Sequence, residues 1–150
     1  MQKTLDMEQF VFLDEAGVNS AMTRLFGWGS RHERVEEYVP DARFERSTIL
    51  SSVRLSGVCA QVSFEGVLNG DLFALYVKYV LAPTLNEGDV LLLDNLSSHK
   101  VVGVFDPIYE CGAFVWFLSA YSSDLNPIEL LWSKVKFVLR KCKVRSFEEL

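Results

Sequence analysis

Short runs of apolar residues, separated by polar or glycine-containing turns, recur along this chain. Continuous runs at residues 10–13, 90–93 and 114–118 predict buried strands. The first run is followed by Asp14 and the second by Asp94, so we expect each strand to carry a carboxylate at its C-terminal end. A carboxylate at a strand end either belongs to a site or caps the following turn.

Two further strands are predicted at residues 47–55 and 58–64. Ser56-Gly57 lies between them and is typical of a two-residue hairpin turn. In the second strand, apolar residues alternate with more polar ones from position 58 to 64. This period of two predicts one buried face and one wetter face.

Three helices are predicted between and after these strands. The first starts at Asn69, is apolar nearly all round over residues 72–81 and stops at Pro83, so we expect it to be buried on several sides. A second covers residues 96–110, with a break implied by Pro107.

The third helix starts at Asn126-Pro127-Ile128-Glu129. Asn is favoured at the N-cap and Pro at N1, and a Glu at N3 reaches back to the cap. Capping is therefore the simplest role for Glu129. Trp132, one turn further along, is expected in the core.

Strands that alternate with helices after an antiparallel hairpin predict an α/β fold, a mixed sheet flanked by helices. The 150 residues suffice for one domain, and 49% of them are hydrophobic. We expect a short leader at residues 1–9 and one domain at 10–150. Three widely spaced cysteines suggest neither disulfides nor a zinc site, and we expect them buried and reduced.

Composition narrows the function classes. No apolar run reaches the roughly 18 residues of a membrane span, and no signal peptide is recognisable, so an intracellular, cytoplasmic protein is expected. Motifs of serine hydrolases and P-loop nucleotide-binding proteins are absent from the sequence. The net charge of −5 is unlike that of most nucleic-acid-binding proteins.

The charge is unevenly distributed, however. Between residues 128 and 145, one acid, Glu129, stands against six basic residues: Lys134, Lys136, Arg140, Lys141, Lys143 and Arg145. On a helix, Glu129, Lys136 and Arg140 share one polar stripe. The stripe is either a solvated face or a surface for phosphate, and we predict that Lys136 and Arg140 contact DNA.

Three carboxylates are candidates for one site. If their strands are neighbours, Asp14 and Asp94 meet at one edge of the sheet and Glu129 joins them from the third helix. Converging carboxylates repel unless a cation compensates, and Mg²⁺ prefers such oxygen ligands. A pair of such ions catalyses phosphoryl displacement, so the pattern suggests phosphodiester chemistry.

The motifs that contain these acids resemble the catalytic domain of DDE transposases, in the branch that mariner-like elements share with bacterial insertion sequences. The segments are FLDE around Asp14, LLDN around Asp94 with His99 following, and YSSDLNPIE ending at Glu129. The 34 residues between Asp94 and Glu129 match the spacing of that branch.

The resemblance implies a ribonuclease H-like fold in which Asp14, Asp94 and Glu129 hold two Mg²⁺ ions, with Mn²⁺ as a substitute. It implies DNA nicking at transposon ends and strand transfer into target DNA, by a homodimer in a synaptic complex near the nucleoid. His99 becomes a further catalytic candidate. Relatives carry an N-terminal DNA-recognition domain that residues 1–9 are too few to form, and the C-terminus is expected to be truncated.

Two alternatives stay open. The loop at residues 118–123 lacks the prolines usual in relatives, which favours a degenerate domain that binds DNA or sister chains without catalysis. The second alternative is a ribonuclease H-like nuclease that acts on another nucleic acid. It would differ from the transposase interpretation only in its substrate.

Overall fold

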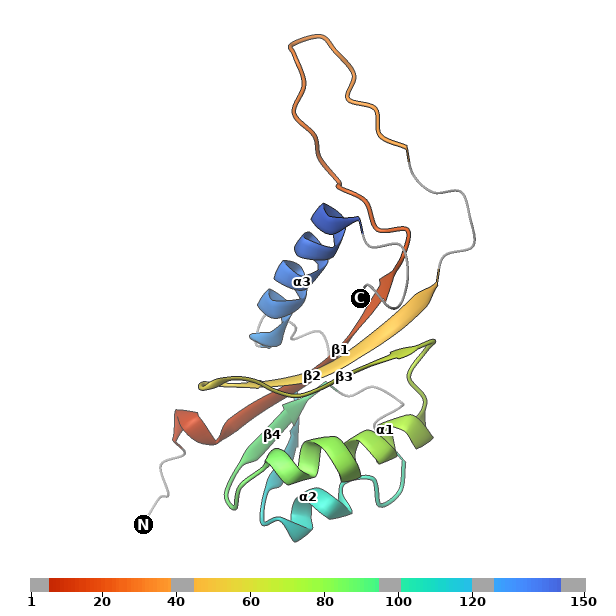
Figure 1. Ribbon diagram of the computed structural model, residues 1–150. Helices are drawn as coiled ribbons and strands as arrows, with labels where there is room; N and C mark the ends of the chain where they lie inside the picture. Colours follow the sequence, from red (N-terminus) through yellow and green to blue (C-terminus); the bar gives the residue numbers. More distant parts are fainter. Residues whose placement is uncertain (1–5, 39–44, 95–100, 120–125, 144–150) are drawn as a thin grey trace.

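Five strands form one mixed sheet in the order β3-β2-β1-β4-β5 (Figure 1). The computed structural model describes residues 6–38, 45–94, 101–119 and 126–143. The strands are β1 (Phe10–Asn19), β2 (Arg46–Arg54), β3 (Gly57–Glu65), β4 (Val90–Leu93) and β5 (Phe114–Phe117). The first three pair antiparallel, whereas β4 and β5 run parallel to β1. The predicted combination of a hairpin with parallel strands is confirmed.

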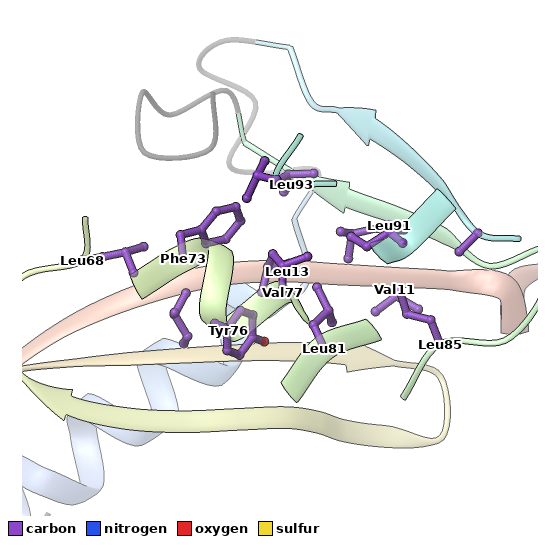
Figure 2. Close-up of a cluster of buried hydrophobic side chains, with 14 residues drawn as sticks. Val11, Leu13, Leu68, Phe73, Tyr76, Val77, Leu81, Leu85, Leu91 and Leu93 are labelled. Carbon is purple, nitrogen blue, oxygen red and sulfur yellow. The ribbon is translucent and has the colours of Figure 1, made fainter. Parts of the chain in front are cut away.

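Helices cover both faces of the sheet (Figure 1). One face carries α1 (Gly70–Tyr76) and α2 (Asp106–Glu110), and the other carries α3 (Ile128–Cys142). The larger core fills the space between the sheet and the first two helices, where Leu13, Phe73 and Leu91 are buried (Figure 2). A smaller core beneath α3 includes Ile128 and Trp132.

Strand β1 serves both cores because its side chains alternate. Val11 and Leu13 belong to the larger core, and Ala16 and Val18 belong to the smaller one. The prediction that the strand ends before Asp14 is wrong, because backbone pairing with β2 continues to Asn19. Asp14 therefore lies in mid-strand and, by alternation, on the face that α3 covers.

The helix predictions need two corrections. The predicted helix at 96–110 is shorter: residues 95–100 are outside the described residues, residues 102–105 form turns and α2 starts at Asp106. Pro107 lies in its first turn, where a missing N–H costs nothing, so it starts this helix and does not break it. The helix predicted to be buried on several sides exposes Leu75 and Tyr79.

The segment after α1 also changes its winding. A π-helical turn, Val77–Leu81, and a 3₁₀ turn, Ala82–Thr84, follow α1 directly. Asn69 caps α1 as predicted, with its side chain accepting a hydrogen bond from the Leu72 N–H. The helical segment therefore ends near Pro83, close to the predicted stop.

The hairpin turn lies one residue earlier than predicted, at Leu55-Ser56, since Arg54 pairs with Gly57. Strand β3 does not keep a simple alternation. Its register shifts opposite Ser51, and Ala60 takes a positive φ of 48° there. Val58, predicted on the buried face, is half exposed.

Polar contacts anchor the ends of the strands. Arg54 at the end of β2 forms a salt bridge with Asp89 just before β4, with 2.8 Å between Nη2 and Oδ2. Asp89 also accepts a hydrogen bond from the Asn86 N–H. The three cysteines are free, but none is buried as predicted: Cys59 and Cys111 are half-buried and Cys142 is exposed.

Two further predictions concern the membrane and the leader. No helix in the described part of the chain is long and apolar enough to cross a membrane. Of the predicted leader, residues 1–5 are outside the described residues, and Met7–Gln9 form a capped 3₁₀ turn.

Candidate functional site

Parallel pairing of β1 with β4 places two aspartates side by side. Phe10 pairs with Val90 and Phe12 with Leu92. Two residues further along both strands are Asp14 and Asp94, at the point where β4 ends. Since side chains repeat every two residues, both aspartates continue the face of the sheet on which α3 lies.

Glu129 approaches from α3. Ile128 and Trp132, on either side of it in the helix, are buried in the smaller core, which fixes this end of α3 on β1. Glu129 itself is exposed and close enough for its charge to raise the pKa of Asp14. The fold thus brings Asp14, Asp94 and Glu129 into one region.

The start of α3 differs in detail from the prediction. The helix begins at Ile128, and the side-chain oxygen of Asn126 accepts a hydrogen bond from the Ile128 N–H at 3.3 Å. Glu129 is then in the second helical position and forms no capping box among the described residues. The predicted capping role of Glu129 is wrong, because the N-cap position belongs to Pro127, one residue later than predicted, and no side chain of the described residues caps it.

Trp132 has a second role that sequence reasoning missed. Its indole Nε1–H donates a hydrogen bond to Oδ2 of Asp14 at 3.0 Å. The predicted core position is correct, since Trp132 is 4% exposed. The two residues are 118 positions apart, so the bond depends on how α3 is placed on β1.

Opposing influences act on the carboxyl group of Asp14. Burial raises its pKa most, and the charges of Glu129 and Asp94 raise it further. Hydrogen bonds from the Glu15 backbone N–H and from Trp132 lower it, but the net shift is upward. The neighbouring charges that act on the pKa of Asp14 are negative, so the region favours the binding of a cation.

No three His, Cys, Asp or Glu side chains in the described ranges are grouped closely enough to hold a metal ion. The acids form an open acidic region and not a closed cage. Lys136 and Arg140 are half-buried on α3. His99 and the proline-free segment 120–125 are outside the described residues.

Comparison with known proteins identifies the family. A family model described as DDE superfamily endonuclease matches residues 9–150. A search of curated proteins found no significant match.

Solved structures of the Mos1 transposase have a similar fold. The Mos1 mariner paired-end complex with Mn has a TM-score of 0.76 and 19% identity, over 95% of this chain and 46% of that one. The Mos1 strand transfer complex has a TM-score of 0.73 and 20% identity, over 95% of this chain and 44% of that one. The catalytic domain of Mos1 mariner transposase has a TM-score of 0.67 and 18% identity, over 95% of this chain and 65% of that one.

These likenesses concern the fold, and this chain spans a little under half the length of the Mos1 chains in the complexes. The predicted resemblance and the predicted ribonuclease H-like architecture are both confirmed. Since the family model covers nearly the whole sequence, this chain belongs to the DDE superfamily endonucleases and has the ribonuclease H-like fold of a transposase catalytic domain.

Proposed function

We propose that this domain cleaves DNA strands and transfers them, using divalent metal ions held by Asp14, Asp94 and Glu129. The pairing of β1 with β4 is the observation that carries the proposal. Asp14, in the middle of β1, lies beside the end of β4, which Asp94 follows directly, and α3 adds a glutamate from a distant part of the chain. Family membership supports the same chemistry.

The residues fit a hard divalent cation. Carboxylate oxygens are the donors that Mg²⁺ and Mn²⁺ prefer. The pKa of Asp14 is raised by burial and by two neighbouring acids, and a cation would offset that repulsion. The charges of both other acids act on Asp14, so a cation held by this residue would lie close to all three carboxylates.

The chain's own groups would hold this arrangement in place. The Trp132 N–H fixes one oxygen of Asp14, and Ile128 packs α3 onto the sheet so that Glu129 stays near the aspartates. Two bound ions would supply the positive charge that activates a hydroxyl nucleophile and stabilises the leaving oxygen. His99, Lys136 and Arg140 are secondary candidates, the first in catalysis and the others for contacts with DNA phosphates.

The solved structures of similar fold include Mos1 transposase in paired-end and strand transfer complexes, some with Mg or Mn. For this chain we infer transposon ends and target DNA as substrates and a homodimer as the working form. A location at the nucleoid would follow from that substrate.

A nicking assay tests the proposal. Supercoiled plasmid is incubated with the protein and Mg²⁺ or Mn²⁺, beside Asp94→Asn, Glu129→Gln and a control, Glu110→Gln, which changes an exposed glutamate on α2. We expect nicking by the wild type and the control and at least a 100-fold loss in the two site variants. Equal nicking by every protein would refute the assignment.

Absence of nicking in the wild type would instead favour the degenerate alternative. In that case the domain would retain the fold and bind DNA or sister chains without catalysis. Cleavage of RNA with no cleavage of DNA would support the third alternative, a ribonuclease H-like nuclease with another substrate.

A further inference from the structure

A long loop between β1 and β2 extends beyond the sheet beside α3 (Figure 1). The structure describes residues 20–38 of it. A turn closes near its tip, where the Glu33 N–H donates to the Ser30 carbonyl at 3.0 Å. Glu37 on the returning arm forms an ion pair with Lys143 at the end of α3. The loop is therefore tied to the helix that carries Glu129.

The Gly27-Trp28-Gly29 segment packs closely against the returning arm of the loop at both glycines. A Cβ on Gly27 would lie 2.6 Å from Val35 Cγ1, and one on Gly29 would lie 2.8 Å from Val35 Cγ2. The glycines let the outgoing arm pack directly on Val35 of the returning arm. Trp28, between them, is fully exposed. This packing explains the two glycines but not the exposed tryptophan between them.

Between this loop and α3 lies a groove with a volume of about 540 Å³. Aromatic and cationic side chains dominate its lining: Arg24, Phe26, Trp28, Phe137, Arg140 and Lys141. Each charged side chain among the described lining residues is cationic. Phe26 and Phe137 are mostly exposed, so their rings are open to a ligand.

The groove lies along the same helix as the acidic region. Glu129 and Arg140 are 11 positions apart in α3, which corresponds to about 16 Å along the axis. A DNA strand with a stacked rise of about 3.4 Å per nucleotide would cover that distance in about five nucleotides. A strand leaving the acids along α3 would reach the groove.

We propose that this groove binds an unpaired stretch of DNA, with bases stacked on Phe26 and Trp28 and phosphates held by Arg24, Arg140 and Lys141. Exposed aromatic rings interleaved with cations are the usual surface for single strands, because every base has a π-face. In a duplex, each base is covered on both faces by its neighbours, so little base surface is left for the aromatic rings to stack on. The inference rests on the proposed function, since it assumes a DNA substrate at the acids.

The experiment measures binding without catalysis. A fluorescently labelled 12-nucleotide single strand is titrated with the full chain in EDTA, and anisotropy gives Kd. We expect Trp28→Ala to weaken binding by about 5- to 100-fold. The matched control is Tyr38→Ala, which removes a fully exposed ring from the same loop but outside the groove. Tyr38→Ala should change Kd less than 2-fold.

A second pair of variants tests the cations. Lys141→Ala should reduce the slope of log K against log salt by about 0.7, as expected for one lost phosphate contact to a single strand. Lys134→Ala, on the same helix but outside the groove, should leave the slope unchanged. A blunt 12-base-pair duplex should lose less than 2-fold affinity with Trp28→Ala.

Unchanged single-strand affinity in Trp28→Ala would overturn the proposal, as would an equal loss in Tyr38→Ala. A change in oligomeric state without a change in Kd would overturn it in favour of a protein interface. Failure of the proposed function is distinguishable, because a protein that nicks no plasmid but binds single strands through Trp28 would leave this inference standing.

Discussion

At the scale of single residues, the carboxyl group of Asp14 determines how stability depends on pH. Its pKa is raised above 3.8, chiefly by burial and then by Glu129 and Asp94. The folded state therefore binds a proton more readily than the unfolded chain does. Above the folded-state pKa of Asp14, its ionised carboxylate lowers the free energy of unfolding of the metal-free protein. This destabilisation decreases as the pH falls through that pKa, and it is absent below 3.8.

Asp14→Asn should therefore raise Tm in EDTA at pH 7, since asparagine removes the charge and can still accept the Trp132 hydrogen bond. Each kcal/mol gained corresponds to about 2–4 °C. Thermal melts from pH 4 to pH 8 measure the effect, and the gain over wild type should shrink toward pH 4. A gain that is constant over this range would mean that charge is not the cause.

Trp132 is a positioning residue for Asp14. Trp132→Phe keeps a ring in the small core but removes the N–H donor, so the pKa of Asp14 should rise further. We expect about 10-fold less nicking at limiting Mg²⁺ and an acid limb of the pH–rate profile that moves to higher pH. Trp116→Phe on β5 is the control. An unmoved profile with a lower Tm would indicate a packing role alone.

At the scale of elements, α3 depends on few buried side chains. Ile128 is fully buried, whereas Leu130 in the same turn is 71% exposed. Ile128→Ala should lower the free energy of unfolding by about 2–5 kcal/mol, because it removes methyl groups and leaves a cavity. Leu130→Ala should change it by less than about 0.5 kcal/mol. Urea denaturation compares the two, and equal losses would contradict this packing.

The salt bridge between Arg54 and Asp89 fixes the hairpin to the start of β4. Asp89 is 4% exposed, so Arg54→Met leaves a buried carboxylate without its cation. The loss should be about 3 kcal/mol in urea denaturation. Adding Asp89→Asn should restore part of it, since the unpaired charge is removed. No recovery would show that Arg54 acts through packing of its stem.

At the scale of the whole molecule, the acidic region joins the sheet to α3, so an ion bound there would stabilise both layers together. With Mg²⁺ at about 100 times its Kd, the gain is about 2.7 kcal/mol, or roughly 5–10 °C in Tm. Asp14→Asn should abolish this shift, and Glu110→Gln should retain it. Thermal melts with and without MgCl₂ decide, and an equal shift in all three proteins would indicate nonspecific binding.

The sequence was informative wherever the chemistry is local. The apolar run 90–93 predicts β4, Asn69 predicts the capped start of α1, and Asn126-Pro127 predicts the start of α3 to within one residue. Each depends on a side chain and its near neighbours in the chain. Family membership could also be predicted, because the three acid motifs and their spacing are contained in the linear order.

Tertiary structure decided what depends on distant partners. Pairing with β2 carries β1 past Asp14, because backbone hydrogen bonding, and not the polarity of one side chain, determines where a strand ends. Packing of α3 on β1 brings the Trp132 N–H to Asp14 and places the loop aromatics beside Arg140. The sequence by itself determined which acids are present and which elements carry them. Their convergence followed from strand order and helix packing, which are set by contacts between residues far apart in the chain.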